Sequence, residues 1–235
     1  PRLAELLQKN LESNRLSFSS DLSAVRDCDI VWLAFDTPVD ENDDADTSPI
    51  FEAAKKIAPH LKDGALVAVS SQIPVGSSEK IKNAVRAAHP GLNFGYAYVP
   101  ENLRLGEAMK CFLEPERVVV GADSPESLSK IKDVFSGLKA EIISMSPASA
   151  EMAKHALNSF LAASISFTND LADVCELAGA DVEDVIKALK TDPRVGQKAY
   201  LFAGLGFSGG TLGRDLRALI RFAEEKDIPL PVINA

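Results

Sequence analysis

The chain has 235 residues, of which 46% are hydrophobic and 25% are charged, a balance that is ordinary for a soluble globular protein. This length allows one large domain or two small ones with a sizeable core. The formal net charge is −9 and no run of basic residues is present, which argues against a nucleic-acid partner. An acidic chain holds an anionic ligand with a few placed groups, so individual Lys, Arg and backbone N–H donors matter more here than the net charge.

The cysteines Cys28, Cys111 and Cys175 are far apart in sequence, and the three histidines form no cluster. An odd number of cysteines without metal-ligand spacing predicts reduced thiols in a cytoplasmic protein and no metal site. The longest uncharged helical run, Ala156–Asn169, is shorter than the roughly 20 residues that cross a bilayer. We therefore expect no membrane segment.

Helical segments and short apolar runs alternate in the first part of the chain. The helical segments are Arg2–Asn14, Ser48–Leu61, Ser77–Ala88 and Pro125–Leu138. The apolar runs, which we interpret as strands, are Asp29–Phe35, Ala65–Ser71, Asn93–Val99, Arg117–Gly121 and Glu141–Ser144. This alternation predicts a parallel sheet covered by helices on both faces. Ligands of such sheets bind beyond the carboxyl ends of the strands, which here are Thr37-Pro38, Ser71-Gln72 and Pro100-Glu101.

The pattern becomes wholly helical after Pro147. One long helix is predicted over Ala148–Gly179, a shorter one runs from its cap Asp181 to Lys190, and another covers Leu212–Lys226. We therefore divide the chain into a Rossmann-like α/β domain, residues 1–146, and an all-α domain, residues 147–235.

No G-x-G-x-x-G motif lies between a strand and a helix, although a sheet of this kind usually opens with such a unit. We expect that unit to lie upstream of Pro1, so that the chain is part of a longer protein. We expect this piece by itself not to catalyse turnover.

The most informative segment is Tyr200–Asp215, YLFAGLGFSGGTLGRD, in which five glycines let the backbone approach a ligand closely. It resembles the active-site loop of the nucleotide-sugar dehydrogenases, the UDP-glucose and GDP-mannose dehydrogenase family. That loop reads tyrosine, a few residues, then G-F-G-G-S-C-F-P-K-D. On this pattern Thr211 occupies the position of the nucleophilic cysteine, and Arg214 that of the lysine.

Four further segments resemble the same family. The run AEMAKHALNSFLA is similar to the family's A-E-x-x-K-x-x-x-N-x-F-L-A, and VPENLRLGEA to its P-E-F-L-R-E-G, with Asn102 and Leu105 where Phe and Glu are usual. SSQIPVGSS is similar to S-T-V-P-V-G-T, with Gln72 in place of threonine, and FDTPVDEND to V-x-T-P-V-D-E. Helical spacing also places Glu151, Lys154 and Asn158 on one face. Without the resemblance, an ion-paired helix end would explain those three residues.

The resemblance implies an NAD-dependent oxidoreductase that acts on the CH–OH group of a nucleotide-diphosphate sugar in polysaccharide precursor synthesis. It also implies a homodimer formed through the helical domain. The residues that it implies for catalysis are Glu101, Lys154, Asn158, Thr211 and Asp215. Those implied for cofactor binding are Thr37, Pro38, Ser71, Gln72, Glu101 and Arg214. Those implied for substrate binding are Val99, Pro100, Lys154, Asn158, Tyr200, Leu201, Gly204 and Ser208.

Thr211 leaves the chemistry open, because the family's second oxidation passes through a cysteine thioester. A threonine hydroxyl is far less acidic than a thiol and needs a strong adjacent base, for which Asp215 is a candidate. Cys111 is a less favoured substitute for the missing thiol. Either the reaction stops at the carbonyl after one hydride, or the aldehyde hydrate is oxidised without a covalent intermediate. The main alternative is a non-catalytic sugar-nucleotide-binding or dimerisation module. The glycine-rich loop fits a 3-hydroxyacid or 6-phosphogluconate type dehydrogenase poorly.

Overall fold

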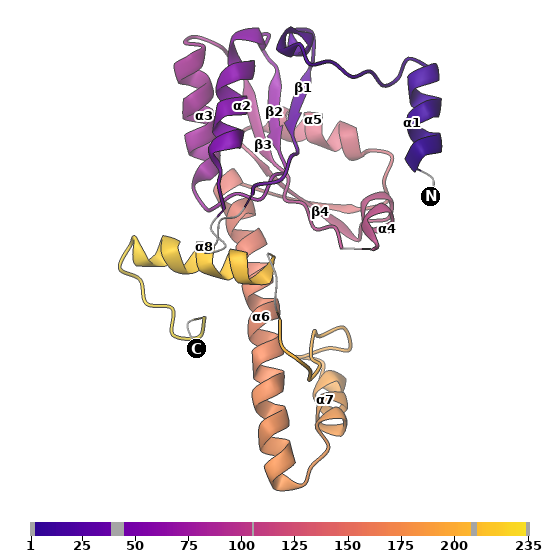
Figure 1. Cartoon of the computed structure of the whole chain (residues 1–235), viewed down its shortest axis with the longest axis vertical. Coiled ribbons are helices and arrows are strands. Elements are labelled where there is room, and N and C mark those ends of the chain that lie inside the picture. The colour runs from indigo at the N-terminus through magenta and orange to yellow at the C-terminus, as the bar shows by residue number, and fades with distance from the viewer. Residues whose placement is uncertain (1–2, 39–44, 105, 208–210, 234–235) are drawn as a thin grey trace.

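The protein consists of an α/β part built on a five-stranded sheet and a helical part built on one long helix (Figure 1). The structure is a computed structural model that describes residues 3–38, 45–104, 106–207 and 211–233. The predicted class, a Rossmann-like α/β sheet followed by a helical region, is confirmed.

The sheet has the strand order β1-β2-β3-β4-β5, which follows the sequence. The strands are β1 (Ile30–Leu33), β2 (Leu66–Val69), β3 (Gly95–Tyr98), β4 (Arg117–Ala122) and β5 (Glu141–Met145). Alternate strand residues point to opposite faces, as the pleat requires. Val67 and Val69 therefore join one core cluster, and Leu66 and Ala68 join another.

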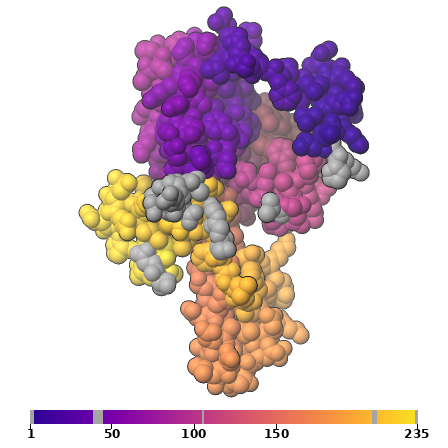
Figure 2. All heavy atoms as spheres, viewed as in Figure 1, coloured from indigo at the N-terminus to yellow at the C-terminus, as the bar shows by residue number. Residues whose placement is uncertain are grey.

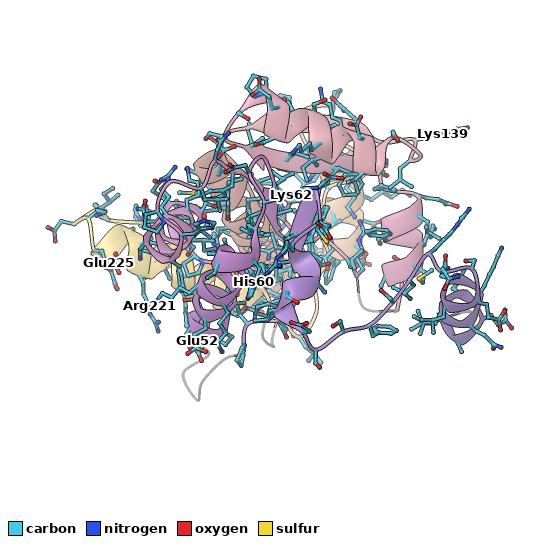
Figure 3. All side chains as sticks on the ribbon, turned by 90° about the horizontal axis from the view of Figure 1, so that it is seen from above. Glu52, His60, Lys62, Lys139, Arg221 and Glu225 are labelled. Atoms are coloured by element: carbon cyan, nitrogen blue, oxygen red, sulfur yellow. The ribbon has the colours of Figure 1, made fainter. Side chains whose placement is uncertain are left out.

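Helices cover both faces of the sheet, as the apolar strands predict. The helices α2 (Ser48–Ile57) and α3 (Ser77–Ala88) pack on one face, and α5 (Pro125–Phe135) packs on the other. Figure 3 shows these three layers from above, with charged side chains such as Glu52 and Lys139 at the periphery.

The predicted parallel arrangement holds for three of the four strand pairs, but β3 and β4 are antiparallel. A parallel crossover needs a connection that carries the chain back across the sheet, usually a helix. Among its described residues, the segment between β3 and β4 contains one helix, the six-residue α4 (Ala108–Leu113), about 9 Å long. The chain therefore re-enters the sheet at the edge where it left, and β4 runs in the opposite direction.

The long helix α6 (Pro147–Ala178) has 32 residues, which corresponds to about 48 Å. Its first turn is capped by Ser146, whose side chain accepts a hydrogen bond from the Ser149 N–H. It ends at Gly179, which adopts the left-handed conformation. The ends of α6, Pro147 and Ala178, each lie one residue from the predicted limits, Ala148 and Gly179.

Two shorter helices follow α6. They are α7 (Val182–Thr191), capped by Asp181 as predicted, and α8 (Leu212–Glu224), which packs across α6 (Figure 1).

Two contacts attach the start of α6 to the α/β part, one to the sheet and one to helix α3. At Gly121 in β4 a Cβ would lie 2.7 Å from both the Cβ of Ala150 and the Cα of Pro147, so only glycine lets the helix approach this closely. The buried Glu151 carboxylate accepts hydrogen bonds of 2.6 Å from the backbone N–H groups of Gly76 and Ser78, at the start of α3. A carboxylate is favourable there because the first turn of a helix has free N–H groups and a partial positive charge.

The remaining elements lie away from this junction. Helix α1 (Leu3–Glu12) stands apart from the sheet (Figure 1), and its indigo atoms project at the upper right of Figure 2. The 3₁₀ turn η1 (Leu22–Val25) precedes β1, and η2 (Ala58–His60) follows α2 directly. Among the described residues no helix is long and apolar enough to cross a membrane, and no cluster of metal-ligating side chains is present. All three cysteines are unpaired.

Candidate functional site

The carboxyl ends of β1 and β2 are joined by side-chain hydroxyls. Ser71 donates to the carbonyl of Phe35 at 2.6 Å, and Thr37 donates to the carbonyl of Gln72 at 2.9 Å. Both hydroxyls are buried, so their hydrogen bonds stabilise the strand ends. The next pair of ends is joined in the same way by Ser70, which accepts from the indole N–H of Trp32 at 2.8 Å and donates to the carbonyl of Val99 at 2.7 Å.

Gln72 connects this edge of the sheet to the start of α8. Its amide nitrogen donates to the carboxylate of Asp215, and its amide oxygen accepts from the guanidinium of Arg214. A carboxylate only accepts hydrogen bonds and a guanidinium only donates, so these two partners allow one orientation of the amide. Arg214 also donates to the carbonyl of Thr37 at 3.3 Å. The structure thus brings together four of the six residues predicted for the cofactor: Thr37, Ser71, Gln72 and Arg214.

Asp215 is completely buried in the first turn of α8. Its carboxylate accepts from the amide of Asn158 on α6 as well as from that of Gln72. Burying a carboxylate costs free energy unless hydrogen bonds replace those it made to water. The two amide donors and the N-terminus of α8 offset part of this desolvation cost. Asn158 and Asp215, both predicted catalytic residues, are therefore in direct contact.

His155 was not predicted as part of the site, yet it lies beside Asp215. Its Nδ1 is 3.5 Å from a carboxylate oxygen of Asp215, and its Nε2 lies 3.0 Å from the carbonyl of Ile73. The ring is buried, with 2% of the residue exposed. Its position in sequence, one helical turn after Glu151 and three residues before Asn158, places it on the same face of α6 and is the signal that could have identified it.

Lys154 points away from that network, toward the segment that follows β3. Its ammonium donates to the carbonyl of Glu101 at 2.6 Å and to the side-chain oxygen of Asn102 at 3.3 Å. Burial lowers the pKa of Lys154, and the carboxylates of Asp215 and Glu101 oppose that shift. The carboxylate of Glu101 is solvent-exposed and accepts from the backbone N–H of Leu103.

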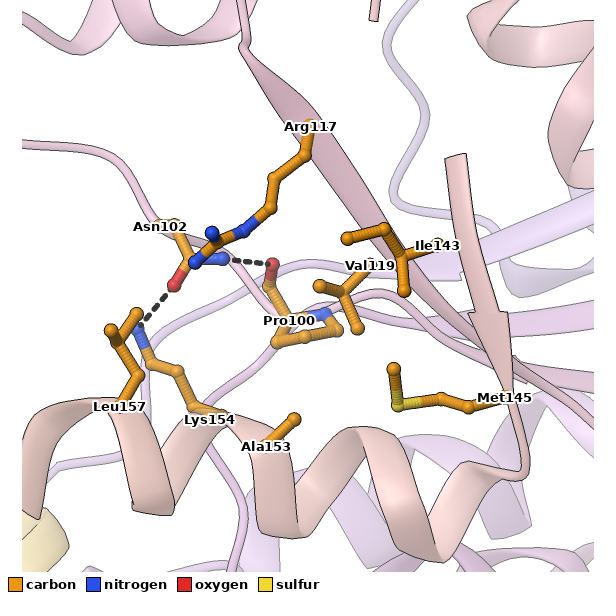
Figure 4. A pocket seen from close by; sticks show the side chains of 9 residues that line it. All are labelled: Pro100, Asn102, Arg117, Val119, Ile143, Met145, Ala153, Lys154 and Leu157. Atoms are coloured by element: carbon orange, nitrogen blue, oxygen red, sulfur yellow. Dashed lines mark hydrogen bonds between the residues drawn. The ribbon is translucent and has the colours of Figure 1, made fainter. Parts of the chain in front are cut away.

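A cavity of about 200 Å³ lies beside Lys154, between α6 and the strands β4 and β5. Arg117 and Lys154 both reach toward Asn102 at its rim (Figure 4). The other lining residues are Pro100, Val119, Ile143, Met145, Ala153 and Leu157. Two cations above an apolar floor suit an anionic ligand with an apolar portion. Ligand pockets typically measure about 300–1,000 Å³, so this one holds only part of a larger ligand.

Comparison with known proteins places the chain in a family. Residues 1–139 match the NAD-binding domain of the UDP-glucose/GDP-mannose dehydrogenase family, and residues 148–235 match the central domain of the same family. The chain belongs to this family. One similar member is UDP-glucose 6-dehydrogenase TuaD of Bacillus subtilis, which is 37% identical over 237 residues, covering 100% of this chain and 51% of TuaD.

Solved structures of dehydrogenases superpose on the chain over its whole length. A UDP-glucose dehydrogenase of the archaeon Pyrobaculum islandicum has a TM-score of 0.89 with 34% identity, covering 100% of this chain and 55% of the other. A GDP-mannose dehydrogenase of Pseudomonas aeruginosa has a TM-score of 0.74 with 27% identity, covering 100% and 56%. The chain thus spans about half the length of the relatives that it matches.

Thr211, the residue expected at the cysteine position of the family's loop, forms the N-cap of α8 and is exposed. The Asp215 N–H donates to its carbonyl at 3.2 Å, as expected one helical turn apart. Within the described residues the Thr211 hydroxyl has no hydrogen bond, and the Asp215 carboxylate points instead to Gln72 and Asn158. The structure therefore does not bring the predicted base to the predicted nucleophile.

The loop residues predicted for substrate binding lie farther along α6. The ring of Tyr200 packs edge-on against Phe202 at 4.8 Å, and the N–H of Gly204 donates to the side chain of Asn169 at 2.9 Å. Asn169 is eleven residues beyond Asn158, about 16 Å along the helix. Leu201 is half-buried in the same loop, and Ser208 lies outside the described residues. Only an elongated ligand would contact both this loop and Lys154.

Proposed function

We propose that this chain supplies the cofactor edge and the sugar-facing helix of an NAD-dependent oxidoreductase that acts on the CH–OH group of a nucleotide-diphosphate sugar. The observation that carries the proposal is the network in which Asn158, Gln72, Arg214 and Asp215 join α6, the sheet edge and α8, in a chain of this family. The relatives named as UDP-glucose dehydrogenases support this reaction class.

The ends of β1 and β2 fit a dinucleotide. Phe35, Asp36 and Pro38 are exposed beyond β1, while the buried hydroxyls of Thr37 and Ser71 hold the edge beneath them. These residues would form the surface that NAD contacts, and Arg214 would add a positive charge beside it. When bound, NAD supplies the hydride acceptor. Ligand binding at this edge agrees with the general position of sites in parallel sheets.

Lys154 would hold the reacting oxygen of the sugar. Its ammonium is half-buried and already donates to the oxygens of Glu101 and Asn102, so it can exchange one of these for an alkoxide that develops as the hydride leaves. The exposed carboxylate of Glu101, on the same segment, is then placed to take up the hydroxyl proton. Asn158 would position Asp215, and the cavity at Arg117 would hold an adjoining part of the substrate.

The position of Thr211 favours a reaction without a covalent intermediate. An unassisted hydroxyl is a weak nucleophile, and within the described residues no base contacts it. We propose that the reaction either stops at the carbonyl after one hydride or oxidises an aldehyde hydrate. The product in either case would serve polysaccharide precursor synthesis, and the unpaired cysteines support a reducing, cytoplasmic location.

The test measures moles of NADH formed per mole of sugar nucleotide consumed, in protein with its natural ends, across a panel of UDP- and GDP-sugars. A ratio of one means that oxidation stops at the carbonyl, and a ratio of two means that an acid forms without the cysteine. Lys154→Met should lower kcat by about 100-fold or more, while Lys154→Arg should keep part of the activity. Tight sugar binding without any NADH would overturn the enzyme proposal in favour of a non-catalytic binding module.

We further propose that the protein forms a homodimer through α6. Phe160, Phe167 and Val174 are exposed by 67%, 53% and 62%, and they recur every seven residues, the spacing of a helix that packs along another helix. The same stripe on a second copy would cover it in a two-fold arrangement. Phe167→Glu should convert a dimer into a monomer in sedimentation velocity, whereas Phe112→Glu on α4, outside the stripe, should not. A wild-type monomer would contradict this.

A further inference from the structure

The buried contact between His155 and Asp215 has no role in the proposed reaction as described so far. The two side chains come from α6 and α8, and both are almost completely removed from solvent. Their closest atoms, Nδ1 of His155 and a carboxylate oxygen of Asp215, are 3.5 Å apart. This exceeds the usual hydrogen-bond range of about 2.7–3.2 Å, and Nδ1 has no hydrogen-bond partner among the described residues.

The other ring nitrogen fixes the tautomer. Nε2 of His155 is 3.0 Å from the carbonyl oxygen of Ile73, and a carbonyl oxygen can only accept a hydrogen bond. Nε2 therefore carries a hydrogen. In a neutral ring Nδ1 then has a bare lone pair facing a carboxylate, an unfavourable arrangement in a buried site. A proton on Nδ1 turns this 3.5 Å contact into an ion pair, in which the ring and the carboxylate attract each other.

The neighbouring cations Arg214 and Lys154 donate hydrogen bonds to other groups, although Lys154 also attracts Asp215 through space. Arg214 donates to Gln72 and Thr37, and Lys154 donates to Glu101 and Asn102.

Two further ionisable groups near the pair, Glu151 and Tyr98, bring no positive charge to Asp215. The Glu151 carboxylate, one turn before His155 on α6, is hydrogen-bonded to the start of α3. Tyr98, on β3, is neutral. Burial raises the pKa of its hydroxyl well above the usual range, and the charges of Glu151 and Asp215 raise it further. The amides of Asn158 and Gln72 donate to Asp215 but carry no charge. His155 lies within reach of Asp215 and can carry the compensating charge.

We propose that His155 and Asp215 share one proton, and that His155 is a positioning residue of the site. The shared proton itself does not depend on the proposed function. Its consequence for the reaction does rest on that function, because the shared proton gives Asp215 a role other than that of a catalytic base. A carboxylate already bound to an imidazolium and two amides is a poor acceptor for a substrate proton. Asp215 instead holds Asn158 on one side and, through Gln72, Arg214 on the other.

The deciding experiment is ¹⁵N NMR of the histidine rings in the protein at neutral pH, without any ligand. We expect both nitrogens of His155 to show the shifts and couplings of protonated nitrogen. In Asp215→Asn, where the negative partner is gone, Nδ1 should lose its proton. His60 and His89 serve as internal references, and the signal is assigned by its absence in His155→Gln. A bare Nδ1 in the wild-type protein would overturn the proposal.

Two variants separate the two ring contacts in protein with its natural ends. In His155→Asn the amide nitrogen lies near the position of Nδ1 and can still donate to Asp215. In His155→Gln it lies near the position of Nε2 and can donate only to Ile73. We expect His155→Asn to stay within about 3-fold of the wild-type kcat. His155→Gln should lower kcat by about 10-fold to 100-fold with little change in KM, the range expected for one hydrogen bond to a charged group.

The opposite order of the two variants would show that His155 acts only through the Ile73 carbonyl, and it would overturn the positioning role. The NMR result needs no substrate. A protein that never turns over would therefore defeat the proposed function while the shared proton is still decided.

Discussion

Glu151 should be among the most sensitive positions for stability, because its carboxylate joins α6 to the start of helix α3 in the α/β part. Glu151→Ala leaves the N–H groups of Gly76 and Ser78 without their acceptor and opens a space at a fully buried position. A hydrogen bond to a charged group contributes about 1.5–3 kcal/mol. Part of the loss is offset because a buried charge no longer has to be desolvated. We expect a net loss of about 3 kcal/mol.

The matched variant is Glu151→Gln, which keeps the shape and one acceptor oxygen but turns an amide N–H₂ toward the other donor. It should lose about 2 kcal/mol, which for a chain of this size lowers Tm by roughly 4–8 °C. Both variants are measured by urea unfolding followed by circular dichroism, with unchanged m-values as the control for two-state behaviour. A loss below about 0.5 kcal/mol for Glu151→Ala would refute the view that this carboxylate holds the two parts together.

Three further predictions concern stability. Gly121→Ala forces a methyl group to within 2.7 Å of α6 and should cost about 1–3 kcal/mol in urea unfolding, whereas Gly137→Ala, which has open space around it, should be nearly neutral. Because the pKa of Lys154 is lowered in the folded state, the unfolded state binds more protons as the pH approaches 10.5. The free energy of unfolding of the wild type should therefore rise relative to that of Lys154→Met as pH rises toward 10.5. A difference between the two proteins that stays constant with pH would contradict this. Asn102→Phe, the residue usual in the family, should fill part of the apolar cavity and raise stability by about 1 kcal/mol, while a lower Tm would show that the lost Lys154 contact matters more.

Much of the fold could be predicted because its signals are local. The limits of α6 follow from the cap Ser146 and the glycine Gly179, which act within a few residues of the helix ends. Helix α3 begins and ends where its spacing indicates, at Ser77 and Ala88. The antiparallel β3–β4 pair could not be predicted from strand patterns, because a buried strand has the same composition in either direction.

The site was predictable in part, from motifs. The spacing of Asn158 on the long helix and the resemblance of the glycine-rich loop pointed to two segments that meet in the structure, where Asn158 contacts Asp215. They did not separate Lys154, which faces the segment after β3, from Asn158, which faces α8. The function of Glu151 in joining α6 to α3 was also hidden, because its partners are backbone groups 73 and 75 residues away.

The sequence by itself determined the order of the elements, the family and the residue types available for chemistry, since periodicity, caps and motifs are properties of short segments. Only the tertiary structure decided that Gln72 meets Asp215, 143 residues farther along, and that His155 lies beside the same carboxylate. Those contacts depend on how α6 and α8 dock against the sheet. That docking is set by side-chain packing and close backbone approach, as at Gly121, over distances along the chain that no local pattern encodes.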